Sequence, residues 1–263
     1  LALMPPIIPV RNPDNPEEYG YGNSSYPTYG SNPIGLQETR DYNQYNNRVL
    51  GNGFFQVEPI KGLQIKTNLG IEYFNYFDRY KTTYKQIRYL TVEKYETSLQ
   101  ENNGDQLSWI WENTMFYQKS INKHSFDALL GYTAQKTTSR GNTATGYNIA
   151  TPGLWVLDQT TVDKTVSGSD GAYAMTSILG RVNYNYNDRY LAQINIRRDG
   201  SSRFGANNRF ATFPSASVGW RISQESFMKK INWIDDLKLR ASYGTLGDQQ
   251  AVGNYAYATY IYT

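Results

Sequence analysis

The sequence predicts an all-β fold made of antiparallel strands, and three observations support this prediction. Apolar and polar residues alternate along several segments, clusters of Gly, Pro, Asn and Asp separate these segments, and aromatic residues make up 15% of the chain. The clearest alternation lies in LQIKTNLGIEYF (63–74), where Leu63, Ile65, Leu69 and Ile71 form one row and polar residues fill most gaps. A period of two residues predicts a strand with one apolar and one polar face.

Two hairpins are predicted in the first half of the chain. The first joins 49–58 to 63–77 across PIKG, and the second joins 107–119 to 126–136 across SINKHS. The apolar rows of the second hairpin are Trp109, Trp111, Met115 and Tyr117, then Phe126, Ala128, Leu130, Tyr132 and Ala134. These rows place the aromatic and aliphatic side chains of both strands on the outward face.

Two further hairpins are predicted in the second half. One joins 172–186 to 190–198 across NDR, and the other joins 213–222 to 237–245 across SQESFMKKINWIDD, the only one of these turns with room for a helical piece. The alternation continues in pairs such as Val182 with Asn183 and Ile194 with Asn195. The tail NYAYATYIYT (254–263) predicts the start of another strand.

The connections between the predicted strands are alternately short and long. PIKG, SINKHS and NDR are short, whereas 78–106 and 137–171 are long and polar, and 199–212 is intermediate. Residues 1–44 are rich in Pro, Gly, Asn and Tyr, which predicts a long irregular loop. Outer-membrane barrels have short periplasmic turns at one end and long extracellular loops at the other. Nothing in a soluble sandwich forces such a difference.

The composition limits the classes of protein to consider. A mean hydropathy of −0.64 leaves no continuous apolar run for a transmembrane helix, but it does not exclude a barrel, whose lumen-facing residues are polar. The absence of cysteine excludes disulfides and cysteine-based zinc sites, and a net charge of +3 with scattered charges argues against a nucleic-acid-binding surface. Aromatic residues near the strand ends fit either bilayer-interface belts or the core of a β-sandwich, so patterning alone leaves both open.

One stretch adds a resemblance to these patterns. RRDGSSRFGANNRFATFPSASVGWRISQESFMK (197–229) resembles the barrel signature of the SusC/RagA family of TonB-linked outer-membrane proteins. The resemblance continues in NYNYNDRYLAQINI (183–196) and DLKLRASYGTLGDQQAVGNYAY (236–257), and upstream in MPPIIPV (4–10), NPI (32–34), KGLQIKTNLGIEY (61–73) and WENTMFYQK (111–119). It therefore spans nearly the whole chain.

This resemblance implies an antiparallel transmembrane β-barrel in the outer membrane that imports oligosaccharides or peptides. It also implies two partners, a SusD-like surface lipoprotein over the extracellular mouth and TonB, which pulls on a plug. We expect residues 1–44 to be an extracellular loop region and 45–263 to supply roughly eight of about 22 barrel strands. No plug, TonB-contacting segment or C-terminal strand is recognisable, so we expect an internal fragment.

Polar residues that alternate with the apolar rows are the candidates for facing the barrel interior, where they would contact the plug, one another or cargo. These lumen-facing candidates are Lys66, Glu72, Arg181, Asn183, Asn195, Arg197, Lys238 and Arg240. A second set, in the signature stretch, is Arg198, Asp199, Gly200, Arg203 and Gly205. The Asp-Gly pair predicts a turn in which the arginines pair with acids such as Asp199. The functional alternative is a rim patch that touches cargo, a partner or anionic lipopolysaccharide.

The sequence contains no recognisable catalytic, cofactor or metal constellation. His124 is the only histidine and lies in a predicted turn, and one histidine without cysteine cannot form a zinc site of the usual kind. NPDNPEE (12–18) lacks the spacing of an EF-hand. We therefore expect a transporter without enzymatic activity. The alternatives are a soluble exported all-β binding or adhesive domain and, with less support, a secreted β-rich hydrolase.

Overall fold

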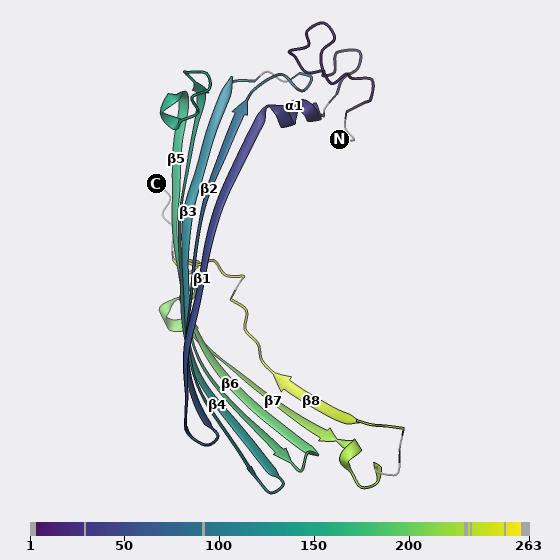
Figure 1. The fold of residues 1–263 in the computed structure, drawn as a ribbon, viewed down its shortest axis with the longest axis vertical. Helices are drawn as coiled ribbons and strands as arrows, with labels where there is room; N and C mark the ends of the chain where they lie inside the picture. The colour runs from purple at the N-terminus through teal and green to yellow at the C-terminus, as the bar shows by residue number, and fades with distance from the viewer. Residues whose placement is uncertain are drawn as a thin grey trace. The chain divides into compact units, whose positions relative to one another are not determined.

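The protein forms one eight-stranded antiparallel sheet with very little helix (Figure 1). The computed structural model describes residues 4–28, 30–90, 93–228, 231, 233–249 and 251–258. The strands pair in chain order and are β1 (Arg40–Ile60), β2 (Leu63–Thr83), β3 (Thr97–Ile121), β4 (His124–Ile149), β5 (Thr160–Tyr186), β6 (Tyr190–Ser201), β7 (Phe210–Arg221) and β8 (Lys238–Gly244). The described helical elements are α1 (Pro33–Glu38) and the 3-10 turns Leu157–Gln159, Ala206–Asn208 and Ile222–Gln224. No helix in this described part is long and apolar enough to cross a membrane.

The predicted all-β chain of roughly eight antiparallel strands is confirmed. The predicted long connections are too long, because residues 78–83 and 97–106 belong to β2 and β3, and residues 137–149 and 160–171 belong to β4 and β5. The predicted irregular loop 1–44 is likewise too long, because residues 33–38 form α1 and residues 40–44 belong to β1. These extensions carry many polar residues in both alternating rows. The apolar period that signals a strand therefore fades there, although backbone pairing continues.

Two predictions about short segments are corrected. The Asp-Gly turn is wrong, because Asp199 and Gly200 pair with Ala211 and Phe210 and β6 continues to Ser201. The Phe210 ring lies where a Cβ on Gly200 would be, 2.3 Å from its nearest ring atom, so the missing side chain lets this pairing continue. In the predicted strand 254–263, residues 254–258 form turns and bends, and 259–263 lie outside the described residues.

The chain divides into two compact units, each described separately below. Unit 1 comprises residues 1–48, 74–106 and 139–170, and unit 2 comprises 49–73, 107–138 and 171–263. Within the described part, unit 1 therefore holds α1 and the two connections 84–96 and 150–159. Unit 2 holds β6, β7 and β8 and the turns that join β1 to β2, β3 to β4, β5 to β6 and β7 to β8.

Asn32 organises the irregular N-terminal segment of unit 1. Its side chain is 2% exposed, and its amide donates to the carbonyls of Val10 (2.9 Å) and Gly20 (2.8 Å). Its oxygen accepts from the backbone N–H groups of Ile34 and Gly35, which caps α1. One buried amide thus satisfies backbone groups from three parts of a segment that is too rich in Pro and Gly to form regular structure.

In unit 2, the registers of β5 to β8 sort the side chains onto two faces, because directly opposed residues in an antiparallel pair point the same way. The apolar face comprises Thr176, Ile178, Gly180, Val182, Tyr184 and Tyr186 of β5, Tyr190, Ala192, Ile194, Ile196, Arg198 and Gly200 of β6, Phe210, Thr212, Pro214, Ala216, Val218 and Trp220 of β7, and Leu239, Ala241 and Tyr243 of β8. The polar face holds the residues between them, including the charged residues Arg181, Arg197, Asp199, Arg221, Lys238 and Arg240.

The apolar face is exposed instead of covered by protein. Ile194, Val218 and Leu239 are each 62% exposed, and in β2 Ile65 and Leu69 are more than 40% exposed. Among the described residues of unit 2, only Met228 is a buried hydrophobic residue. A soluble domain would bury these rows against a second layer. No second layer formed by the described residues therefore covers this apolar row.

The short turns of unit 2 use residues that tolerate left-handed backbone. Gly62 has φ +89°, and a Cβ there would lie 2.4 Å from the Gln118 carbonyl oxygen. Asn187 and Asp188 have φ of 52° and 59° in the β5–β6 turn, which is the conformation of a type I′ turn. The Asn187 N–H also donates to the Lys123 carbonyl at 2.6 Å. Neighbouring turns are thus linked by backbone hydrogen bonds.

A buried carboxylate joins the β5–β6 and β7–β8 turns. Glu225 accepts hydrogen bonds from the Trp220 indole (3.0 Å) and the Tyr190 hydroxyl (2.9 Å), and it pairs with Arg189 (3.2 Å). The hydrogen bond from Trp220, followed by that from Tyr190, lowers the pKa of the Glu225 carboxyl group. Two aromatic residues of the apolar face are therefore held by one charged acceptor.

This lowered pKa predicts that the β7–β8 connection loosens in acid. The stabilisation by ionised Glu225 is fully present above the ordinary carboxyl pKa of 4.5 and is lost as the pH falls through the lower folded value. Amide hydrogen exchange of residues 222–228, corrected for intrinsic rates, should show this loss between about pH 5 and pH 3. The Glu225→Gln variant should lack this pH dependence, and an unchanged profile in that variant would assign the effect to other carboxylates.

Candidate functional site

The polar face of unit 2 contains a concave site. A groove of about 910 Å³ lies over it near the short turns, and its lining includes Gln118, Asp127, Asn183, Gln193, Lys238 and Arg240. Strands far apart in the sequence supply these side chains, from β3 and β4 to β8. The sheet therefore gathers amide groups, two carboxylates (Glu58 and Asp127) and four cations (Lys61, Lys119, Lys238 and Arg240) into a single open surface.

Side-chain hydrogen bonds form a ladder across the strands of this face. Asn195 accepts from Arg181 Nε (2.9 Å) and from Gln193 Nε2 (3.0 Å), and it donates to the Ser215 hydroxyl (3.1 Å). One strand further on, the Asn183 amide donates to Asp127 at 2.6 Å. Each group thus has a partner, as expected for a polar surface that keeps a defined shape.

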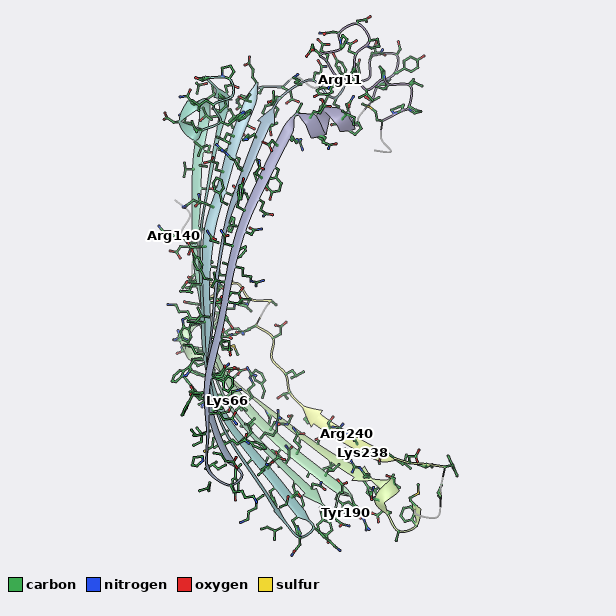
Figure 2. All side chains as sticks on the ribbon, in the orientation of Figure 1. Arg11, Lys66, Arg140, Tyr190, Lys238 and Arg240 are labelled. Carbon is green, nitrogen blue, oxygen red and sulfur yellow. The ribbon has the colours of Figure 1, made fainter. Side chains whose placement is uncertain are left out.

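The two predicted cations of β8 take no part in this hydrogen-bond ladder. Lys238 and Arg240 are exposed on β8 (Figure 2), and among the described residues neither side chain forms a hydrogen bond or an ion pair. The Lys238 stem lies over Gly219, where a Cβ would lie 3.3 Å from Lys238 Cε. These ammonium and guanidinium groups therefore offer free positive charge to whatever enters the groove.

The candidates on β2 occupy a separate part of the same unit. Lys66 lies over the Phe54 ring, 4.6 Å from its centroid, and Glu72 is half-buried. The neighbouring Asn68 donates to Glu112 on β3 at 3.0 Å, and on the opposite row the Trp111 indole donates to Thr67 at 2.9 Å. These contacts place Trp111 with the apolar row of β2, as the sequence predicts.

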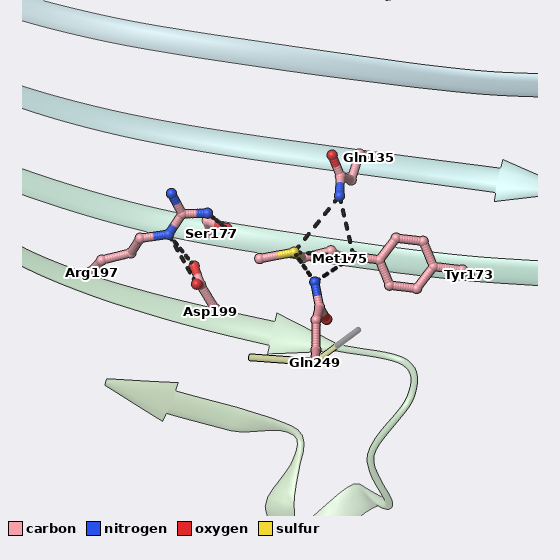
Figure 3. A network of polar contacts seen from close by, with 7 residues as sticks. All are labelled: Gln135, Tyr173, Met175, Ser177, Arg197, Asp199 and Gln249. Atoms are coloured by element: carbon pink, nitrogen blue, oxygen red, sulfur yellow. Dashed lines mark hydrogen bonds and ion pairs between the residues drawn. The ribbon is translucent and has the colours of Figure 1, made fainter. Parts of the chain in front are cut away.

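Arg197 and Asp199 anchor the polar face near the other end of β6 (Figure 3). Arg197 Nε lies 2.7 and 2.9 Å from the two Asp199 oxygens, and the guanidinium also donates to the Ser177 hydroxyl at 3.2 Å. The adjacent Arg198 belongs to the apolar face and does not take part in this pairing. The predicted pairing of the arginines with Asp199 therefore holds for Arg197 and is wrong for Arg198, because successive strand residues face opposite sides.

A second polar cluster includes residues that sequence reasoning missed. The Tyr173 hydroxyl accepts from Gln135 (3.2 Å) and from Gln249 (2.7 Å), and it lies 3.2 Å from the Met175 sulfur (Figure 3). Met175 shares the parity of Arg181 and Asn183 on β5, and Gln135 alternates with the apolar row of β4, so the alternation could have identified both. Gln249 lies beyond β8, where no periodic signal existed.

Arg203 of the signature stretch fixes the segment that follows β8. Its guanidinium lies 4.7 Å from the centroid of the Tyr173 ring and donates to the Gln249 carbonyl (2.8 Å) and the Asn254 side chain (3.1 Å). Gly205 lies beside Tyr257, 3.7 Å from its Cβ when a Cβ is placed on the glycine. Gln249, Asn254 and Tyr257 are thereby held near β5.

The polar face of this unit offers amides, hydroxyl groups and cations, which can form hydrogen bonds and ion pairs. His124 hydrogen-bonds the Tyr184 hydroxyl at 2.8 Å. Among the residues that the structure describes, no group of three or more His, Cys, Asp or Glu side chains could hold a metal ion.

Arg203 gives a direct test of how the segment 245–258 is held. The Arg203→Lys variant keeps the charge but loses the planar donor geometry, so amide exchange in residues 251–255 should rise about tenfold. The matched control is Arg209→Lys, because Arg209 is an exposed arginine of the same connection. Equal exchange in both variants would show that other contacts hold the segment.

The comparisons with known proteins identify relatives of one kind. No family model matches the chain. The TonB-dependent receptor P3 of Formosa agariphila is 34% identical over 75% of the chain, and the receptor P39 of the same organism is 29% identical over 84%. The TonB-dependent receptor SusC of Bacteroides thetaiotaomicron is 46% identical over 32% of the chain and 8% of its own length.

The solved structures agree with these sequence relatives. The RagAB peptide transporter structure superimposes with a TM-score of 0.79 at 27% identity, covering 89% of the chain and 26% of the matched chain. The chain spans about a fifth of the length of P3 (20%) and P39 (21%). The sequence similarity and the shared sheet lead to the same conclusion: the chain belongs to the SusC/RagA family of TonB-dependent outer-membrane proteins.

Proposed function

We propose that this chain is part of the barrel wall of an outer-membrane transporter that imports nutrients by a TonB-dependent mechanism. The main support for this proposal is that the β5–β8 sheet has one exposed apolar face and one polar face. An apolar row that no protein layer covers is suited to lipid, and an alternate polar row is suited to a water-filled or plugged interior.

In this proposal the polar face lines the interior of the barrel. Arg181, Asn183, Asn195 and Arg197 form or join the hydrogen-bonded wall, whereas Lys238 and Arg240 add cationic groups. Lys66 and Glu72 would face the same interior from β2. Of the predicted loop region 1–44, residues 1–39 would be extracellular, and residues 40–44, which belong to β1, would join 45–263 in the strands and loops of the wall.

The cargo and the partners follow from the relatives and remain part of the proposal. The RagAB structures are described as a peptide transporter, and the SusC relative is a TonB-dependent receptor. We infer a cargo of peptides or oligosaccharides, a SusD-like surface lipoprotein as partner, and TonB as the source of force through a plug outside this chain. No enzymatic step is required of the wall itself.

Neighbouring residues of β6 test the orientation of the two faces. The chain has no cysteine, so a nitroxide can be attached to the Ile194→Cys or Gln193→Cys variant of the full-length protein, with any cysteine elsewhere replaced. In bilayers, we expect the label at 194 to collide mainly with oxygen and the label at 193 mainly with a water-soluble nickel chelate. The reason is that oxygen concentrates in hydrocarbon and the chelate stays in water.

Each other outcome has a definite meaning. If both reagents fail to reach the label at 194, protein covers that face, and the soluble binding or adhesive domain becomes the correct class. If the nickel chelate reaches 194 freely, the apolar face does not meet lipid, and the transporter proposal fails.

Import itself is tested in cells that lack the full-length protein. We expect growth on one class of oligosaccharide or peptide, supplied as the limiting nutrient, to be lost and to return with the wild-type gene. The same gene should fail to restore growth in cells without TonB. Growth that is independent of TonB would contradict the proposed mechanism even if the protein resides in the outer membrane.

A further inference from the structure

Arg198 is the only charged residue among those that the β5–β8 registers place on the apolar face. It is paired with Ile178 on one side and with Thr212 on the other, and the next residue of its own row is Ile196. Ile178 and Ile196 are both more than half exposed. An arginine at this position is therefore unexpected, because placing a charge on a lipid-facing surface costs free energy.

The position of Arg198 along the strand reduces that cost. Arg198 lies near the end of β6 that leads into the 202–209 connection, whereas Tyr190 and Trp220 mark the end of the apolar face with the short turns. The cost of arginine on the lipid face falls toward zero at the membrane interface. In the proposed topology this end belongs to the outer leaflet, so Arg198 would lie at the level of lipid headgroups.

The contacts of Arg198 leave its charge unneutralised. Its guanidinium carbon lies 5.2 Å from the centroid of the exposed Phe210 ring, and among the described residues it has no carboxylate partner. Arg197, one residue earlier, forms an ion pair with Asp199 (2.7 Å) on the opposite face. A cation–π contact stabilises a guanidinium but does not use its N–H donors for a hydrogen bond.

The surrounding backbone keeps this arrangement in place. Gly200 is paired with Phe210, and a Cβ on Gly200 would lie 2.3 Å from the Phe210 ring. The ring therefore rests directly on the backbone of β6, beside Arg198. This fixed ring gives the arginine an apolar platform at the boundary between hydrocarbon and headgroups.

From these observations we propose that Arg198 and Phe210 bind the phosphate group of an anionic lipid of the outer leaflet, namely the lipid A part of lipopolysaccharide. The guanidinium would supply paired N–H donors to phosphate oxygens, and the Phe210 ring would contact the adjoining lipid. This inference rests on the proposed outer-membrane function and adds a ligand on the outside of the wall.

The test measures lipid A binding by native mass spectrometry of the purified full-length protein in detergent. We expect Arg198→Gln to weaken binding of phosphorylated lipid A at least about fivefold and Arg198→Lys to weaken it less, because a lysine keeps the charge without the paired donors. Phe210→Leu should also weaken binding. The control Lys123→Gln, which removes a positive charge from a short turn, should bind like the wild type.

Two further probes separate the sources of phosphate. Dephosphorylated lipid A should bind the wild-type and Arg198→Gln proteins equally, and inorganic phosphate at the same concentration should not displace lipid A. If Arg198→Gln binds phosphorylated lipid A as tightly as the wild type, the site is wrong. If inorganic phosphate displaces the lipid, the site binds free anions and the lipid proposal is overturned.

The spin-label experiment at 193 and 194 distinguishes failure of this inference from failure of the proposed function. An apolar face in lipid together with unchanged lipid A binding by Arg198→Gln rejects only the Arg198 site. If protein shields residue 194, the membrane placement is rejected, and the proposed outer-leaflet ligand is rejected with it.

Discussion

The structure depends on backbone hydrogen bonding within one eight-stranded sheet, and among the described residues no second layer covers its β5–β8 part. Each strand from β2 to β7 satisfies its peptide groups through the strands beside it, so the two faces are free to take opposite chemistry. In β5–β8 one face carries Ile, Val, Leu and aromatic residues, and the other carries amides, hydroxyl groups and ions. A sheet of this kind gains little from a protein core and much from a boundary between lipid and water.

The polar side chains connect neighbouring strands of this sheet. The ladder through Arg181, Asn195 and Ser215 links three strands, and Arg197 with Asp199 adds an ion pair to the same face. At the short turns, Glu225 holds Tyr190 and Trp220 together. Polar-face residues therefore link neighbouring strands, and Glu225 in the β7–β8 connection holds the two aromatic residues of the other face.

The contrast between Arg197 and Arg198 connects the wall to both of its environments. Because adjacent strand residues face opposite sides, the Arg197 guanidinium contacts Asp199 on the polar face and the Arg198 guanidinium lies over the Phe210 ring on the apolar face. In the proposed wall, the first face would meet cargo and the second would meet lipid. Adjacent positions could then change the interior and the lipid contacts independently, because successive strand residues face opposite sides.

The sequence by itself determined the strand class, the parity of the strand residues and the family, because a period of two residues and a long signature stretch are both local properties. Arg181, Asn183, Asn195, Lys238 and Arg240 share one face as parity predicts. Only the tertiary structure decided where the polar strand extensions end, that Asp199–Gly200 is strand, and that Gln249 returns to Tyr173. These features depend on pairing between distant segments, which leaves no periodic trace in the chain.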